Sequence, residues 1–169
     1  MYVFDATPLI YLATVEKLTL IEHLPEPCHT PRAVYDEVVV RGIEEGHADA
    51  RRIERAVEDG LLCVEDVDET PVLERLRRNE NLSEADAAVL ARAAARDGTA
   101  VMDEAYGRTV ADAERIETRG TAFLVLRLLR DDAIDADEAR ATIDELVAAG
   151  WYCAPDLYAT LVRRIESLE

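Results

Sequence analysis

Two aspartates stand directly after two short apolar segments, and each is followed by a segment that favours a helix. Asp5 follows residues 2–4, and Asp103 follows residues 99–102, both of which we expect to be strands. Short strands that alternate with helices are typical of a parallel sheet. Ligands of such sheets bind in the crevice outside the carboxyl ends of the strands. If these two strands are neighbours, both carboxylates enter one crevice.

Two carboxylates in one crevice repel each other, and this repulsion indicates what binds between them. Unit charges 4 Å apart interact by about 4 kcal/mol at an effective dielectric constant near 20. A divalent cation is the obvious compensation, since hard oxygen ligands suit Mg²⁺ and Mn²⁺. Asp5 and Asp103 are therefore candidate metal ligands.

Two further acids have both a structural and a functional interpretation. Glu37 lies in an expected helix over residues 32–40, where it either faces solvent or flanks the apolar stripe that includes Val34. Asp86 lies three residues after Ser83, so it either completes a capping box or reaches the crevice from an alanine-rich helix turn. The sequence leaves both alternatives open.

The remaining pattern predicts the elements that must position these acids. Thr7-Pro8 and Thr30-Pro31 predict helix starts, because threonine caps free N–H groups and proline suits the first turn. Further strands are expected over residues 26–29, 61–64 and 115–118. Helices are expected over residues 8–20, 32–40, 48–59, 72–78, 83–97, 121–129, 136–149 and 155–168, with another around Arg108. This alternation predicts an α/β fold.

Length and composition predict one globular domain. A chain of 169 residues, 49% hydrophobic, buries roughly two-thirds of its unfolded surface. We expect one domain over residues 1–169, with residues 121–169 as a helical C-terminal part in which Leu157, Leu161 and Ile165 serve packing or an oligomer surface. We find no membrane-spanning run and no signal peptide, so we expect a cytoplasmic protein.

The net charge of −17 would normally argue against a nucleic-acid partner, because phosphates are bound by basic patches. Asp and Glu total 36, however, and Lys17 is the single lysine among 19 basic residues. Such a surface suits a salt-rich cytosol, since at about 1 M salt the Debye length is roughly 3 Å. Our hypothesis is therefore halophilic adaptation, which leaves the choice of partner open.

Cysteine and histidine spacing indicates neither a zinc site nor a disulfide. Cys28, Cys63 and Cys153 are far apart and form no CxxC motif, so we expect reduced, small core residues. Of the three histidines, only His29 lies near the end of an expected strand.

Four segments, in order, carry a resemblance to a known family: FDATPLIYLA, TPRAVYDEVV, LSEADAAVLARA and VMDEAYGRTVA. They resemble the four acidic motifs of the PIN-domain ribonucleases, which include VapC-like toxins. The segments GTAFLVLRLLRDDAI and GWYCAPDLYATLV are similar to a PIN subfamily of uncharacterised prokaryotic proteins. The resemblance covers nearly the whole chain, and its specificity lies in the order of the four motifs.

The resemblance implies a three-layer α/β/α sandwich on a mostly parallel sheet. It also implies that four acids converge on Mg²⁺ or Mn²⁺: Asp5, Glu37, Asp86 and Asp103. Thr7 would support the first acid by hydrogen bonding, Glu104 would be a further supporting acid, and Arg108 would contact a substrate phosphate.

The implied activity is metal-dependent hydrolysis of RNA phosphodiester bonds, in which the metal activates water and stabilises the developing charge. An antitoxin partner and a homodimer are implied as well. One alternative, a haloacid-dehalogenase-like phosphatase, requires D-x-D, whereas Thr7 stands two residues after Asp5. The other alternative is a PIN-like fold that no longer cuts and instead binds RNA or a protein.

Overall fold

Five short strands form one parallel sheet at the centre of the computed structural model, which describes residues 1–168. The sheet order is β3-β2-β1-β4-β5. The strands are β1 (Tyr2–Phe4), β2 (Cys28–Pro31), β3 (Cys63–Glu65), β4 (Thr99–Val101) and β5 (Glu117–Arg119). All three residues of β1 are buried, as expected for a central strand with helices on both faces.

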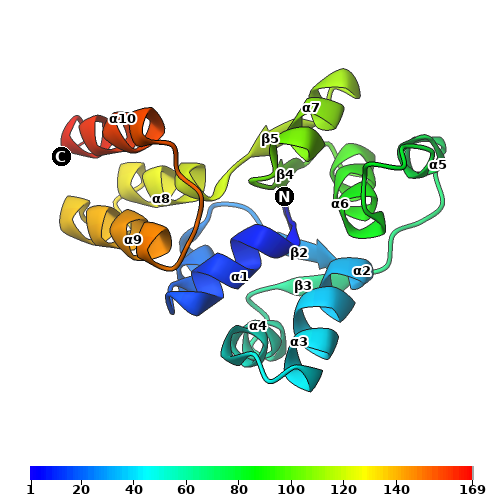
Figure 1. The fold of residues 1–169 in the computed structure, drawn as a ribbon, viewed down its shortest axis with the longest axis horizontal. Coiled ribbons are helices and arrows are strands. Elements are labelled where there is room, and N and C mark those ends of the chain that lie inside the picture. Colours follow the sequence, from blue (N-terminus) through cyan, green and yellow to red (C-terminus); the bar gives the residue numbers. More distant parts are fainter. Residues whose placement is uncertain (169) are drawn as a thin grey trace.

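Helices cover both faces of this sheet, which confirms the predicted three-layer α/β/α sandwich. In Figure 1, α1 lies to the left of the strands and α6 to the right. Helix α1 packs against α4, whereas α6 packs against β1, β2 and β4. The helices are α1 (Ala6–Thr14), α2 (Arg32–Tyr35), α3 (Gly42–Glu44), α4 (Ala48–Glu58), α5 (Pro71–Arg77), α6 (Glu84–Ala95), α7 (Ala105–Ala113), α8 (Thr121–Arg130), α9 (Ala136–Ala148) and α10 (Pro155–Glu166), together with the 3-10 helix η1 (Leu18–His23) and the π-helix η2 (Asp36–Arg41).

The order of the strands creates one topological switch point, between β1 and β4. The chain adds β2 and β3 on one side of β1 and then returns to add β4 and β5 on the other side. Phe4 is level with Val101 in the parallel register, and the Asp5 N–H donates to the Val101 carbonyl at 3.0 Å. The strands before Asp5 and Asp103 are thus parallel neighbours, which is the condition under which the sequence places both carboxylates at one crevice. Ligand sites of open α/β sheets form at such a point.

The two Thr-Pro pairs mark helix starts, but neither threonine is the cap. Helix α1 begins at Ala6, so Asp5 takes the N-cap position, without a capping hydrogen bond from its side chain. Thr30 belongs to β2, and its hydroxyl donates to the Phe4 carbonyl at 2.9 Å. A tertiary contact has thus replaced the local cap, and it ties β2 to the end of β1.

Two predicted helices differ in extent from the observed ones. The helix expected over residues 8–20 ends at Thr14, because Glu16 adopts a left-handed backbone with φ of 60°, and η1 follows. The helix expected over residues 32–40 runs through the π-helical turn η2 to Glu44. This widened turn buries two consecutive valines, Val38 and Val39, and leaves Glu37 exposed. Rare π-helical turns occur frequently at functional sites.

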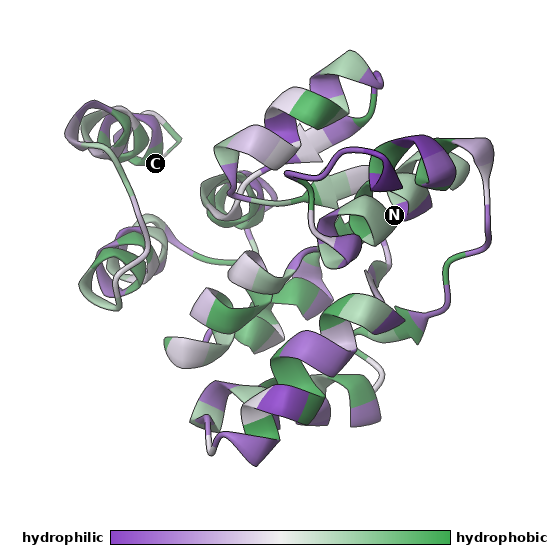
Figure 2. Ribbon diagram, turned by 45° about the vertical axis from the view of Figure 1, so that its right-hand side comes forward, coloured by the Kyte–Doolittle hydropathy of each residue, from purple (hydrophilic) through white to green (hydrophobic). Residues whose placement is uncertain are grey.

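The three C-terminal helices pack on one another and lie together at one end of the molecule in Figure 1. Leu161 and Ile165 are buried within the chain, which supports the packing alternative for these two residues, whereas Leu157 is 43% exposed. Figure 2 shows the central elements as mostly hydrophobic, with hydrophilic residues on much of the outer helices and loops. Within residues 1–168, no helix is both long and apolar enough to cross a membrane.

The edge strand β3 begins two residues later and ends one residue later than predicted. Its first residue, Cys63, is exposed and so is not the expected core residue, whereas Cys28 on β2 is buried. Glu65, which lies just beyond the predicted strand 61–64, is the last residue of β3.

Candidate active site

Asp5 lies at the centre of the candidate site and is 4% exposed. It follows β1 directly, and its backbone is held by the hydrogen bond from its N–H to Val101. The hydroxyl of Thr30 holds the preceding carbonyl, that of Phe4. The position of this carboxylate is therefore set by the three central strands.

The environment of Asp5 raises the pKa of its carboxyl group to about 7. Burial is the largest cause, since it penalises the charged form. The charges of Asp86, Glu37 and Asp103 raise the pKa further, while the neighbouring Ala6 N–H lowers it. In the part of the chain that the structure describes, no cation is among the groups that act on this carboxylate. The fold thus brings the other three acids within electrostatic reach of Asp5.

Asp103 is held by hydrogen bonds from two C-terminal segments. Its Oδ1 accepts from the Thr121 N–H at 2.8 Å, and its Oδ2 accepts from the Thr121 hydroxyl at 2.7 Å. The same Oδ2 accepts from Trp151 Nε1 at 3.0 Å. Gly120 permits this close approach, because a Cβ at that position would lie 2.8 Å from Oδ1. The orientation of Asp103 is therefore fixed before any ligand binds.

Trp151 reaches Asp103 from the linker between α9 and α10. The linker turns at Gly150, whose φ of 100° favours glycine, and the Gly150 carbonyl accepts a hydrogen bond from the Tyr11 hydroxyl at 3.1 Å. Sequence reasoning did not identify Thr121 or Trp151 as part of the site. A Gly-Thr pair at a helix start is only a weak signal, and nothing in the sequence places Trp151 beside Asp103.

Asp86 forms the capping box that its spacing predicts. Its N–H donates to Ser83 Oγ at 3.0 Å, and its Oδ2 accepts from the Ser83 hydroxyl at 2.7 Å and from the Ser83 N–H at 3.3 Å. Both alternatives for Asp86 are thus compatible, since the same carboxylate caps α6 and raises the pKa of Asp5.

A buried ion-pair network anchors the helix that carries Asp86. Arg92 on α6 is 8% exposed and pairs with Glu65 Oε2. The other oxygen of Glu65, Oε1, lies 3.1 Å from His29 Nδ1 on β2. The network connects α6 to β2 and β3, and it gives His29 a structural partner.

The supporting residues implied by the resemblance lie in different surroundings. Glu104 is the N-cap of α7, and its Oε2 accepts from the Gly107 N–H at 2.6 Å. Thr7 lies in the first turn of α1, and no hydrogen bond to Asp5 from its side chain occurs in residues 1–168. Arg108 is exposed, and its Nη1 would lie 3.7 Å from a Cβ at Gly120, which places its guanidinium beside Asp103.

The four acids fit a hard divalent cation by the chemistry of their donor atoms. All are carboxylates, and the buried Asp5 carboxylate has no cation to balance it. As placed, no three Asp, Glu, His or Cys side chains of the described residues are grouped closely enough to hold a metal. Ligation by this set would therefore require side chains to move, and Glu37 is the exposed member.

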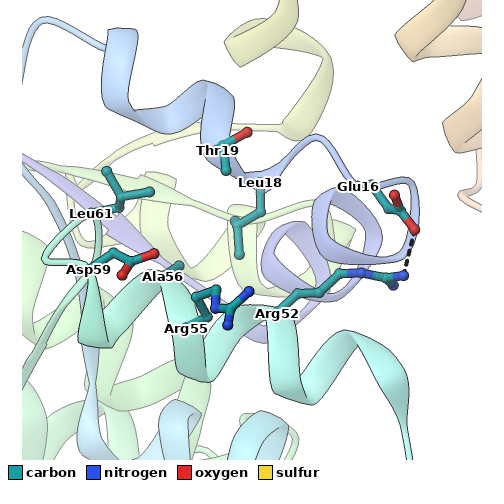
Figure 3. A pocket seen from close by; sticks show the side chains of 8 residues that line it. All are labelled: Glu16, Leu18, Thr19, Arg52, Arg55, Ala56, Asp59 and Leu61. Carbon is teal, nitrogen blue, oxygen red and sulfur yellow. Dashed lines mark hydrogen bonds and ion pairs between the residues drawn. The ribbon is translucent and has the colours of Figure 1, made fainter.

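A groove of about 760 Å³ begins at this site. Its lining includes Thr7, Asp103 and Arg108, and also Leu157 and Leu161 of α10. A separate hollow of about 140 Å³ lies beside α4, where the Glu16 and Arg52 side chains point toward each other in Figure 3. None of the four acids lines the second hollow, so the groove is the one that belongs to the candidate site.

Comparison with known proteins identifies the family. The family model DUF3368, described as a PIN domain, matches residues 1–167. Searches of the curated proteins and of the solved structures gave no match. The five-stranded, all-parallel sheet and its flanking helices agree with the family model. The resemblance seen in the sequence is confirmed, and the chain belongs to this family of PIN domains.

Proposed function

We propose that this PIN domain is a metal-dependent ribonuclease that hydrolyses RNA phosphodiester bonds. Asp5, Glu37, Asp86 and Asp103 would hold Mg²⁺ or Mn²⁺. The observation that carries the proposal is the buried Asp5 carboxylate at the β1/β4 switch point, whose pKa is raised by burial and by the charges of three other acids, with no cation of the described residues among the groups that act on it. A divalent cation there would offset both the mutual repulsion and the cost of burial.

Each residue has a distinct part in this proposal. A bound cation would supply activation of water and stabilisation of charge at the phosphate. Asp5 anchors the site, because strand hydrogen bonds hold its backbone. Asp103 keeps a fixed orientation through Thr121 and Trp151. Arg108, exposed beside Asp103, supplies a positive charge for a substrate phosphate.

Thr7 and Glu104 have supporting parts. Thr7 lines the groove at its Asp103 end and so faces the substrate side of the site. Glu104 caps α7, the helix that carries Arg108, and so positions that arginine.

The test is cleavage of a labelled single-stranded RNA at high salt, with Mn²⁺, with Mg²⁺ or with EDTA. We expect metal-dependent cutting by the wild type and by Asp112→Asn, an exposed acid on α7 outside the site. We expect none by Asp5→Asn or Asp103→Asn. Equal cutting by all four proteins would point to a contaminating nuclease and would refute the assignment of the site.

A specific observation favours a second candidate, a PIN domain that binds RNA or a protein without cutting. Asp103 and Asp86 already accept hydrogen bonds, and no metal-ligating group of three is formed within residues 1–168. Calorimetric titration with Mn²⁺ separates the two functions. Binding of Mn²⁺ that is lost in Asp103→Asn supports the nuclease, whereas heat changes indistinguishable from buffer support the binding module.

The biological role that we propose is that of a cytoplasmic toxin in a toxin–antitoxin pair, active as a homodimer and held inactive by an antitoxin protein. Arrested growth on expression of the wild type, with normal growth on expression of Asp5→Asn, would support it. Normal growth with both proteins would favour a role in RNA processing. Light scattering at working salt tests the homodimer, which a monomeric mass would exclude.

A further inference from the structure

We propose that the groove beside Asp103 is a binding site for an unpaired nucleoside of the RNA strand. The base would stack on the aromatic side chain of Tyr152, and Arg108 and Arg119 would hold the adjoining phosphates. This inference rests on the proposed function and adds to it the residues of this groove that would hold the unpaired base next to the cleaved bond.

The groove is continuous with the candidate site and large enough for this ligand. Asp103 belongs to both, so a strand that leaves the carboxylates enters the groove directly. Its volume of about 760 Å³ lies within the range of roughly 300–1,000 Å³ typical of small-molecule sites. Its walls come from α1, α7, α8 and α10 together with the linker before α10, so they are formed by packed elements.

Two arginines, Arg108 and Arg119, line the groove and balance the charges of Asp103 and Glu104, so its lining is formally neutral in a chain whose net charge is −17. Arg119 lies over the half-buried Phe123 ring, 5.0 Å from its centre, and its Nη2 pairs with Glu117 at 2.7 Å. Arg108 forms no ion pair within the described residues, so its charge is available to a ligand. Because the protein as a whole repels a polyanion, a neutral lining that carries two guanidinium groups repels phosphates less than the acidic remainder of the surface does.

Aromatic and apolar side chains form much of the remaining surface. Tyr152, which is 85% exposed, and Leu157, which is 43% exposed, both line the groove. Trp151, the single tryptophan of the chain, also lines the groove. Aromatic rings next to arginines are the platform on which single-stranded nucleic acids stack their bases. A duplex keeps the faces of its bases inside the helix, so it cannot use such a platform.

The aromatic ring of Tyr152 and the guanidinium of Arg108 together favour a nucleotide over other occupants of the groove. A protein segment or a second copy of the chain could cover the apolar part. An acidic side chain of either could pair with the Arg108 guanidinium, whereas a nucleotide supplies both a phosphate for Arg108 and a planar base for Tyr152. Both of these occupants become outcomes of the test.

The test measures binding in the Asp5→Asn background with Mg²⁺ at fixed high salt, so that the RNA stays intact. Quenching of Trp151 fluorescence reports entry of a base into the groove. The probes are a single-stranded RNA oligonucleotide, the duplex of the same sequence, and single strands in which one base at a time is removed. Tyr152→Ala is compared with Tyr106→Ala, a tyrosine of α7 that is 39% exposed and does not line the groove.

We expect the single strand to bind and the duplex to bind weakly. Tyr152→Ala should weaken binding by about 5- to 150-fold, the range for loss of one base–aromatic stack, while Tyr106→Ala stays within about twofold. Removal of one particular base from the RNA should weaken its binding to the Asp5→Asn protein. The same removal should have little further effect on binding to the protein that also carries Tyr152→Ala. Because Tyr152 is so exposed, its replacement should leave the melting temperature unchanged.

Three results would overturn the proposal. If the wild type cuts RNA but Tyr152→Ala binds as tightly as Tyr106→Ala, the groove is not the nucleoside site, although the nuclease function stands. If Tyr152→Ala changes the mass in light scattering and leaves RNA affinity intact, a second copy covers the groove. If the wild type neither cuts nor binds RNA, the proposed function and the groove fail together.

Discussion

Replacement of Asp5 by asparagine should stabilise the metal-free protein at alkaline pH. The pKa of the buried carboxyl group is about 7 in the folded state and about 4 in the unfolded chain. A difference of about three units corresponds to about 4 kcal/mol at pH values above both. Asparagine has nearly the shape of the protonated acid and carries no charge, so Asp5→Asn should avoid this cost.

The sign follows from proton binding. Between pH 4 and pH 7 the folded protein binds more protons at Asp5 than the unfolded chain does, so its stability falls as the pH rises. Below pH 4 both states are protonated and this contribution vanishes. Above pH 7 the whole penalty of about 4 kcal/mol is present, and it stays constant.

The assay is thermal unfolding of the wild type and Asp5→Asn from pH 5.5 to pH 8.5, in EDTA and at one fixed high salt concentration. For a chain of this length about 4 kcal/mol shifts the melting temperature by about 8–16 °C. Roughly half of that difference should be present at pH 5.5 and all of it at pH 8.5. Asp68→Asn, an exposed acid in the loop before α5, is the matched control and should follow the wild type.

Two results would refute this reasoning. A variant less stable than the wild type at pH 8.5 would mean that the Asp5 carboxylate is stabilised in the folded state, with a lowered pKa. A difference in melting temperature that stays constant with pH would mean that the substitution acts through packing. Addition of Mn²⁺ should raise the melting temperature of the wild type at pH 8.5, because the ion offsets the negative charge of the Asp5 carboxylate. The effect on Asp5→Asn should be smaller, because the variant lacks that charge.

Three further predictions follow from particular contacts. Trp151→Phe keeps most of the bulk but removes the N–H that holds Asp103 Oδ2, so we expect Mn²⁺ affinity, measured by titration, to fall about 10- to 100-fold. Glu65→Gln leaves the buried Arg92 without its counter-charge, so the free energy of unfolding, measured by urea titration, should fall by about 3 kcal/mol. An unchanged urea midpoint would show that the network does not anchor α6. Because the net charge is −17, the melting temperature should rise steeply between 0.1 M and 3 M KCl, and melting that is indifferent to salt would refute halophilic adaptation.

The sequence predicted the positions that depend on strand ends. Asp5 and Asp103 could be placed at one crevice because parallel strands present their carboxyl ends at the same edge of a sheet, and β1 and β4 are indeed neighbours. Asp86 could be predicted as a cap because a capping box is a local pattern with fixed spacing. In each case the information lies within a few residues of the acid.

The partners of these acids could not be predicted, because they come from distant parts of the chain. Trp151 lies 48 residues beyond Asp103, in a linker without periodicity, and only the packing of α9 and α10 brings it there. The acid-rich segment after residue 64 indicates a loop, yet Glu65 ends a strand and pairs with Arg92, because β3 lies beside His29. Thr30 shows the same limit, since its tertiary hydrogen bond to Phe4 replaces the local cap.

The four acids are not equally free to move, and this sets how a metal site would be completed. Asp5 is fixed by the strands, Asp103 by Thr121 and Trp151, and Asp86 by its capping box. Glu37, exposed on the π-helical turn η2, has no comparable restraint in the part of the chain described here. The fold therefore holds three carboxylates in place without a metal, and the burial of Asp5 lowers its stability. Glu37 is the carboxylate that would move to complete the coordination of a cation. Loss of Asp5 should thus act on stability and on metal binding together. Loss of Glu37 should weaken metal binding but should not destabilise the metal-free fold, because it removes one of the charges that raise the pKa of Asp5.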